Sequence, residues 1–253
     1  MNSTVVTLLA FGCTFGAALL AVFAREQLPR HHVEGDSREV VKLVLGLMAT
    51  LTALVLGLLI SSAHAAYDAQ DAELQQLGIH LYQLDRILAH FGPAAIDERA
   101  QLRRIVADDI ARIWPAGHVV KVREAPMVAQ QEIESLFDGI GSLSPKADLE
   151  RVGQRRAIEI LGAIGETRHL LIAQSQGALS WPFLFILMSW MTILFFGFGL
   201  IARRNATVLG ALFIGSLSVS GAILLILQMN QPYGGWIQVS SAPLRSALAQ
   251  MGS

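Results

Sequence analysis

The side chains best placed for chemistry lie in an uncharged run between Leu43 and Tyr67. Small residues recur at four-residue spacing, with hydroxyls and a histidine at the end: Ala49, Ala53, Gly57, Ser61, Ser62 and His64. In a membrane helix such a stripe lets another helix approach closely. Alternatively it could line a pore in an oligomer, because narrow side chains leave space and hydroxyls add weak polarity. His64 could be a pH-sensitive gate or an interfacial residue among lipid headgroups.

A second candidate element follows the last apolar run. A proline and paired glycines interrupt the helical pattern there, and two aromatic residues flank the glycines: Gln228, Pro232, Tyr233, Gly234, Gly235 and Trp236. Tyrosine and tryptophan are typical of membrane interfaces, so we expect an interfacial anchor. The alternative is a re-entrant element, which needs protein or water around its irregular backbone.

Signatures of catalysis are absent from the sequence. It has no HExxH, GxSxG or P-loop motif, and the apolar runs contain no Asp or Glu. This argues against an intramembrane enzyme and a proton-coupled transporter. Cys13 is the only cysteine, which excludes an intrachain disulfide. Adjacent His31 and His32 are only weak evidence for a metal site. From these observations together we predict no enzyme activity, no cofactor and no metal site.

The elements that carry these residues are long and free of charge. Four runs lack Asp, Glu, Lys and Arg, at residues 1–24, 43–67, 169–202 and 205–244. Charged side chains are costly inside a bilayer, and about 20 apolar residues cross one as a helix. We therefore predict four transmembrane helices, near residues 4–24, 43–63, 181–202 and 206–229. The lipid bilayer is the expected surrounding.

The charged middle of the chain is predicted to be a soluble helical domain. Residues 68–168 hold sixteen acidic and twelve basic side chains. Leucines at spacings of three and four predict an amphipathic helix ended by Gly92-Pro93: Leu74, Leu77, Leu81, Leu84 and Leu88. Further amphipathic helices are predicted near residues 96–114, 128–140 and 146–175, the last starting after Ser144-Pro145. The leucine helix could continue the second span, and the helix near residues 146–175 could run into the third span.

The predicted fold class is all-α, with two plus two transmembrane helices flanking this domain. The predicted divisions are residues 1–66 with spans one and two, 67–178 as the soluble helical domain, 179–230 with spans three and four, and 231–253 as an interfacial C-terminal segment. That last segment contains an amphipathic helix beginning at Ala242-Pro243.

Composition and charge limit the partners. Hydrophobic residues make up 53% of the chain and charged residues 15%, against about 25% charged in soluble domains. A net charge of -1 argues against nucleic acid as a partner. Lys and Arg concentrate in the connections between spans one and two and between spans three and four, at Arg25, Arg30, Arg38, Lys42, Arg203 and Arg204. The positive-inside rule then places these connections in the cytoplasm and the middle domain outside.

Three short segments carry a resemblance to a known family. They are Arg25-Glu26-Gln27-Leu28-Pro29 with His31 or His32, residues 56–67, and Gln231-Pro232-Tyr233-Gly234-Gly235 through Pro243-Leu244. These segments resemble the bestrophin-like family, multi-pass proteins of the bacterial inner membrane. The resemblance implies similarity to bestrophins, which are pentameric anion channels with the second transmembrane helix lining the pore. Bestrophins keep the middle domain in the cytosol, contrary to the charge pattern. We recognise no selectivity or gating motif of bestrophins here.

Two functions remain open from the sequence. The first is a homo-oligomeric ion channel, selective for anions if the resemblance holds, with the second span near the axis. The second is a non-conducting membrane scaffold or sensor whose helical middle domain binds a protein partner. Ion flux and an oligomeric state would favour the first function, and capture of a partner without flux would favour the second.

Overall fold

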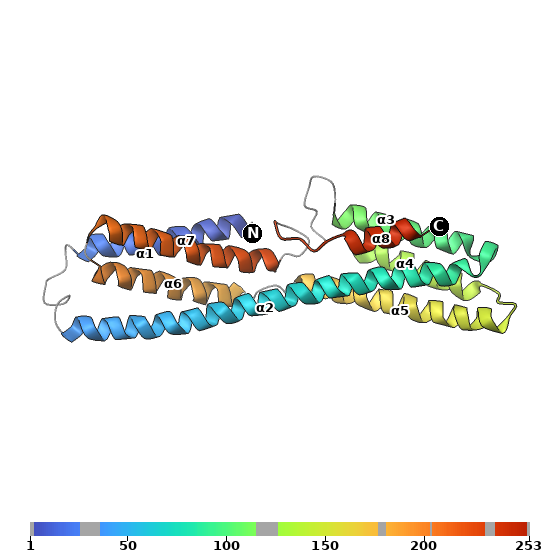
Figure 1. Cartoon of the computed structure of the whole chain (residues 1–253), viewed down its shortest axis with the longest axis horizontal. Coiled ribbons are helices and arrows are strands. Elements are labelled where there is room, and N and C mark those ends of the chain that lie inside the picture. The colour runs from blue at the N-terminus through green and yellow to red at the C-terminus, as the bar shows by residue number, and fades with distance from the viewer. Residues whose placement is uncertain are drawn as a thin grey trace. The chain divides into compact units, whose positions relative to one another are not determined.

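The computed structural model describes residues 3–25, 36–114, 126–176, 181–202, 204–230 and 236–251. These residues form helices and connections, with no β-strand among them. The chain divides into two compact units. The membrane unit comprises Met1–Ala66 and Leu179–Asn230, and the helical unit comprises Tyr67–Ala178 and Gln231–Ser253. The all-α fold class predicted from the sequence is confirmed (Figure 1).

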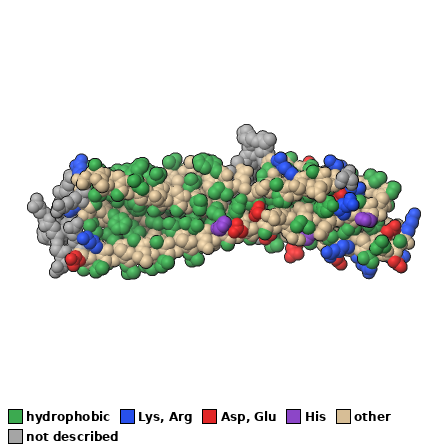
Figure 2. All heavy atoms as spheres, viewed as in Figure 1, with side chains coloured by type: hydrophobic (Ala, Val, Ile, Leu, Met, Phe, Trp, Pro, Cys, Tyr) green, Lys and Arg blue, Asp and Glu red, His purple; other side chains and the backbone are tan. Residues whose placement is uncertain are grey.

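Four helices are long and apolar enough to cross a membrane, judged by length and composition. They are α1 (Ser3–Arg25), α2 (Asp36–Ala89), α6 (Trp181–Ile201) and α7 (Ala206–Met229). Three of them contain a predicted span, and α6 ends one residue before the end of the third predicted span at Ala202. Hydrophobic side chains cover much of the visible face over α1, α6, α7 and the N-terminal half of α2 (Figure 2).

Helix α2 is one continuous helix of 54 residues. It therefore joins the predicted second span to the predicted leucine helix of the middle domain, as the sequence suggested. Helix α5 (Asp148–Gln176) precedes α6, and residues 177–180 between them lie outside the described residues. The start of α5 differs from the prediction at Lys146. The Glu150 carboxylate accepts hydrogen bonds from the backbone amides of Lys146 and Ala147, so these two amides are satisfied ahead of the first helical residue.

Three helices form the interior of the membrane unit, because α1 packs along both α6 and α7. Apolar clusters fill the two contact zones: Val6, Ala10, Leu184, Ile223 and Leu227 in one, and Ala18, Val22, Phe195 and Leu212 in the other. Small side chains and glycines permit the close approach. At Gly199 of α6, an added Cβ would lie 2.8 Å from Ala21 Cβ and would overlap the Ala18 carbonyl oxygen.

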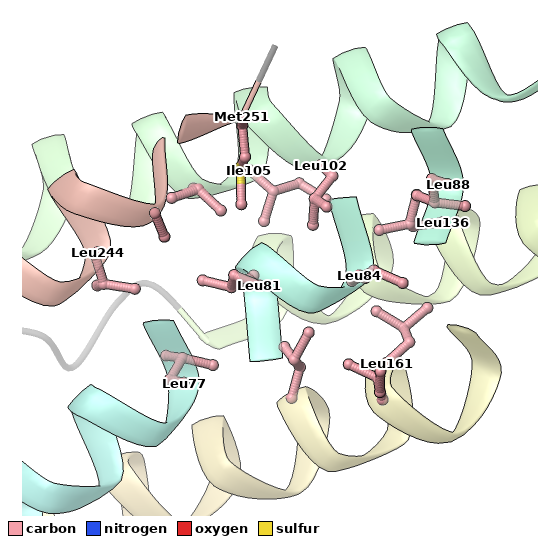
Figure 3. Packing of buried hydrophobic residues seen from close by; sticks show 14 of the residues in the cluster. Leu77, Leu81, Leu84, Leu88, Leu102, Ile105, Leu136, Leu161, Leu244 and Met251 are labelled. Carbon is pink, nitrogen blue, oxygen red and sulfur yellow. The ribbon is translucent and has the colours of Figure 1, made fainter. Parts of the chain in front are cut away.

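The helical unit is built from the C-terminal part of α2, α3 (Ile96–Ile113), α4 (Pro126–Ser142), α5 and the short α8 (Ala242–Gln250). Its core consists mainly of leucine and isoleucine from all five helices (Figure 3). The predicted stripe from Leu74 to Leu88 faces this core, with each of its five leucines 6% exposed or less. A 3-10 helix, η2 (Gly92–Ala95), follows α2, and Gly92 there adopts a positive φ of 61°.

Helix α8, which was predicted to belong to an interfacial segment, contributes to this core. Val239, Leu244, Ala247 and Met251 are buried among the side chains of the helical unit. Trp114 Nε1 donates to the Val239 carbonyl at 3.0 Å, and Arg103 donates to the Met251 carbonyl at 3.1 Å. A nine-residue helix has little stability in isolation, so these contacts hold α8 in shape.

Candidate functional site

The membrane part of α2 is the least covered apolar helix of the chain. In its most apolar 18-residue stretch, 11% of the residues are buried, against 28–39% for the corresponding stretches of α1, α6 and α7. Leu45, Thr52 and Ala63 are its buried positions. Leu45 lies against Gly197 of α6, where a glycine leaves room for the leucine side chain. Most of this helix is therefore available to lipid or to another protein.

The candidate stripe lies on the uncovered part of α2. Ala53, Gly57, Ser61 and His64 are exposed, and their spacings of four and three residues place them on one side of the helix. A Cβ added at Gly57 would meet nothing within 4 Å. Ala49, at the start of the stripe, is half-buried, and Ser62 is exposed about 100° around the helix from Ser61. From Ala53 to His64, the stripe residues are therefore not buried by their own chain.

A second exposed face of α2 is made of leucine. Leu47, Leu54 and Leu58 are 63%, 66% and 71% exposed. They lie about 60–100° around the helix from Gly57, and Leu54 is only about 20° from Ser61, so the two faces adjoin each other. Large aliphatic side chains suit contact with lipid chains or with an apolar partner, whereas glycine, serine and histidine suit water or a close helix contact. The two exposed faces of α2 thus differ in chemistry.

The second candidate element is described in part. Gln228, near the end of α7, is buried, and its Nε2 atom donates to Ser3 Oγ of α1 at 3.1 Å. This contact satisfies a buried amide and ties the two helices together. Trp236 is 86% exposed. Pro232, Tyr233, Gly234 and Gly235 lie outside the described residues, so the interfacial and re-entrant interpretations stay predictions.

The ends of α1 and α6 are joined by arginine. Arg25 donates through Nη1 to the carbonyl oxygens of Ile201 and Ala202, which lie where the chain leaves α6. A cation at a helix C-terminus stabilises the unpaired carbonyls there. Arg204 lies over the ring of Phe23, with its guanidinium carbon 5.0 Å from the ring centre. Two of the six basic residues used for the orientation argument therefore make specific contacts.

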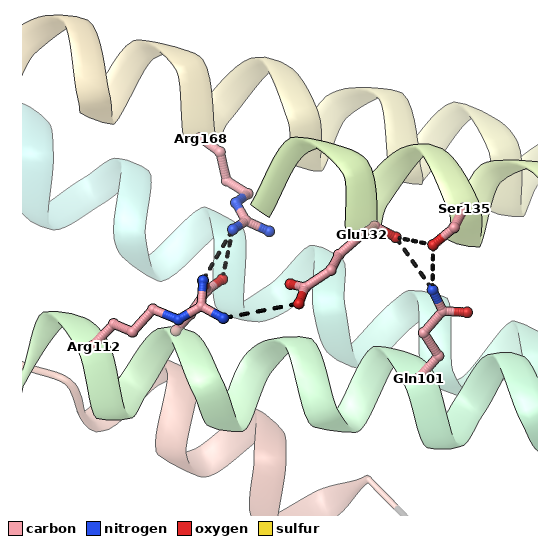
Figure 4. A network of polar contacts seen from close by, with 6 residues as sticks. Gln101, Arg112, Glu132, Ser135 and Arg168 are labelled. Carbon is pink, nitrogen blue, oxygen red and sulfur yellow. Dashed lines mark hydrogen bonds and ion pairs between the residues drawn. The ribbon is translucent and has the colours of Figure 1, made fainter. Parts of the chain in front are cut away.

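Sequence reasoning did not find a set of charged side chains within the helical unit. Arg168 of α5 lies 2.9 Å from the Asp109 carboxylate of α3, and Arg112 of α3 lies 3.8 Å from the Glu132 carboxylate of α4. Figure 4 shows the side chains of Arg168, Arg112 and Glu132 directed toward one another from three helices. Burial raises the pKa of Asp109, although Arg168 and Arg112 lower it.

These residues had no recognisable signal in the sequence. Asp109 and Arg168 are separated by 59 positions, and each sits among other charged residues of an amphipathic helix. Within the amphipathic helix predicted near residues 96–114, Asp109 directly precedes the apolar Ile110, and this neighbour is the one sign of a partly buried carboxylate. Among the described residues, no group of three or more His, Cys, Asp or Glu side chains could hold a metal ion.

Comparison with known proteins gives a consistent assignment. The family model described as Bestrophin-like domain matches residues 12–244. No curated protein matches the chain. Two crystal structures of single-residue variants of a bacterial bestrophin homologue from Klebsiella pneumoniae are similar in fold. One is 14% identical with a TM-score of 0.65, covering 96% of this chain and 97% of the other. The second is 13% identical with a TM-score of 0.68, covering 99% and 97%.

A further crystal structure, of a protein described only as a membrane protein, has a TM-score of 0.70 at 13% identity and covers 96% of both chains. At these identities the structures establish the fold, whereas the family model covers most of the sequence. The resemblance inferred from the three short segments is confirmed. With its four apolar helices, the chain is a membrane protein that belongs to the Bestrophin-like family.

Proposed function

We propose that this protein is the subunit of a homo-oligomeric, anion-conducting channel of the bacterial inner membrane, with α2 nearest the axis. The observation that carries the proposal is the exposure of α2, whose most apolar stretch is only 11% buried within its own chain. A helix so little covered gains stability when neighbouring subunits pack against it. Membership of the Bestrophin-like family supports the same arrangement, because bestrophins are pentameric channels whose second transmembrane helix lines the pore.

The two exposed faces of α2 have separate roles in this proposal. The face with Ala53, Gly57, Ser61 and His64 borders the conduction path, because narrow side chains leave room for an ion and its water. Backbone and hydroxyl groups offer dipoles there without a fixed negative charge, which would repel anions. The face with Leu47, Leu54 and Leu58 packs against the neighbouring subunit. His64 is then placed at one mouth of the path.

Chloride flux and oligomeric state test the proposal directly. Purified protein is examined by native mass spectrometry in mild detergent and is then reconstituted into chloride-loaded liposomes. The expected result is a single homo-oligomer and chloride release above that of empty liposomes. A monomer without release would refute the channel.

Thiol accessibility tests the assignment of the two faces. Ala53→Cys and Leu58→Cys are made in a Cys13→Ser background, so that each variant has one cysteine. The two positions lie about 140° apart around the helix, one on each face, and both are exposed within the chain. A charged, membrane-impermeant thiol reagent is expected to modify Ala53→Cys and to reduce flux, and to leave Leu58→Cys unmodified. Equal reaction at both positions would contradict the assignment.

A second function, a scaffold whose helical unit binds a protein partner, has one observation in its favour. Leu149 and Val152, on the first turns of α5, are 82% and 52% exposed, and Phe137 of α4 is 43% exposed. Exposed apolar side chains on a water-soluble unit favour protein contacts. Replacement of Leu149 and Val152 by Ser distinguishes the two functions: a scaffold loses its partner in crosslinking experiments, whereas a channel keeps its chloride flux.

A further inference from the structure

Four charged side chains from three helices meet at one place in the helical unit. Arg168 of α5 contacts both carboxylate oxygens of Asp109 on α3, at 3.0 and 2.9 Å. Arg112 of α3 reaches toward Glu132 of α4 (Figure 4). The side chains of Arg168 and Asp109 are only 15% and 21% exposed. When one member of a largely buried ion pair loses its partner, the folded protein is strongly destabilised.

The two pairs are not equally complete. Glu132 lies 3.8 Å from Arg112, which is long for a charge-assisted hydrogen bond. Its second oxygen, Oε2, is buried and has no hydrogen-bond partner in the described part of the chain. A buried acceptor without a donor costs free energy that a new donor would recover. The Oε2 atom of Glu132 can therefore accept a hydrogen bond from a second guanidinium in the same cluster, beside Arg112.

We propose that this cluster is an acid-responsive junction, in which Arg168 exchanges Asp109 on α3 for Glu132 on α4 when Asp109 binds a proton. The proton comes from water and adds to the Asp109 carboxylate. The carboxyl group becomes neutral and able to donate a hydrogen bond. Arg168 keeps its positive charge and moves to the Glu132 carboxylate. The net charge of Asp109, Arg112, Glu132 and Arg168 changes from zero to plus one.

The surroundings of Asp109 favour proton uptake at a higher pH than that of an ordinary aspartate. Burial raises the pKa of this carboxyl group, and the negative charges of Glu132 on α4 and Asp108 on α3 add to that effect. Arg168 on α5 and Arg112 on α3 oppose it. Leucine side chains from α2 and α8 line the small cavity beside Asp109 and Arg168: Leu77, Leu81 and Leu244. These apolar side chains offer no polar group that would stabilise the charged form of Asp109.

The exchange changes which helices are tied together. At neutral pH the arginine links α5 to α3, and in acid it links α5 to α4. Helix α5 ends at Gln176, and the apolar helix α6 begins at Trp181. The junction therefore acts on a helix that is followed within a few residues by a membrane span. This inference does not require that the protein conducts ions.

A double-mutant cycle on the full-length protein tests the exchange. Thermal unfolding midpoints are measured for wild type, Arg168→Gln, Glu132→Gln and the double variant, at about pH 7.5 and about pH 5. We expect only weak coupling between the two substitutions at about pH 7.5, because Arg168 is paired with Asp109 there. At about pH 5 the double variant should shift less than the sum. Additivity at both values, or the same non-additivity at both, would overturn the proposal.

The same cycle in an Asp109→Asn background distinguishes protonation of Asp109 from other effects of low pH. Asparagine carries no negative charge at either pH, so Arg168 and Glu132 should be coupled at both values. Continued pH dependence of the coupling in this background would overturn the role of Asp109. The exposed pair Arg156–Glu159 is the matched control, since both members are more than 60% exposed and its coupling should stay small and constant.

Hydrogen exchange of the wild-type protein gives a measurement that needs no variant. After correction for intrinsic rates, the amides of α4 should gain protection on going from about pH 7.5 to about pH 5, relative to those of α3. The gain should be several-fold and reversible. An unchanged ratio between α4 and α3 would overturn the exchange.

Discussion

Gly199 is the position at which the packing of the membrane unit can be tested most sharply. Replacing it by alanine adds a single methyl group to α6. This methyl group would overlap the Ala18 carbonyl oxygen and lie 2.8 Å from Ala21 Cβ, both on α1. Backbone and Cβ atoms cannot rotate away, so the two helices must separate. Such overpacking costs about 1–3 kcal/mol.

The control for this substitution is Gly210→Ala on α7. Gly210 is exposed, and an added Cβ there meets nothing within 4 Å. Both substitutions replace a helical glycine by alanine, which by itself favours the helix by about 1 kcal/mol. The difference between the two variants therefore isolates the packing cost of about 1–3 kcal/mol. For a chain of this size, each kcal/mol shifts the unfolding midpoint by about 2–4 °C.

Thermal unfolding in detergent, followed by circular dichroism, measures both midpoints. Gly199→Ala should unfold about 2–12 °C below Gly210→Ala. Gly197→Ala should fall between them, because the clash there is with the end of the flexible Leu45 side chain. If Gly199→Ala is as stable as Gly210→Ala, the close contact of α1 with α6 is refuted.

Three further predictions concern the helical unit. Leu84→Ala removes a fully buried side chain and should lower the free energy of unfolding by about 2–5 kcal/mol, measured by chemical denaturation, whereas the exposed Leu149→Ala should cost far less. Arg103→Gln should loosen α8, so trypsin should cut after Arg245 faster than in wild type; unchanged cleavage would show that the bond to the Met251 carbonyl contributes little. Because the pKa of Asp109 is raised, its contribution to stability is fully present below the unfolded pKa and is lost as pH rises through the folded value. The unfolding midpoint of wild type relative to Asp109→Asn should therefore fall as pH rises above about 4, and a constant difference would contradict the raised pKa.

The sequence was most informative where a single physical requirement dominates. Charge-free runs predicted the four apolar helices, and the leucine spacing from Leu74 to Leu88 predicted which face of α2 is buried. Both depend on transfer of side chains out of water, which is local to each helix. The family resemblance likewise came from short segments that lie near span ends.

Contacts between segments far apart in the chain could not be predicted from the sequence. The stripe at Gly57 and Ser61 was visible as a pattern, but only the structure showed that its own chain leaves it uncovered. Helix α8 looked like an interfacial helix because its apolar spacing suits lipid and protein equally well. The pairing of Arg168 with Asp109 depends on how α3 and α5 pack, and many charged residues on those helices were equivalent candidates.

The position of α8 also determines the order in which the protein can be assembled. Val239, Leu244, Ala247 and Met251 belong to the core of a unit whose other helices lie before residue 179. The ribosome makes α6 and α7 between these two parts. The core of the helical unit therefore stays incomplete, with an apolar surface exposed on its nascent helices, until α6 and α7 have been synthesised. Its completion is thereby linked to insertion of α6 and α7, and a chain that stalls before α8 exposes a surface that quality-control proteases can recognise.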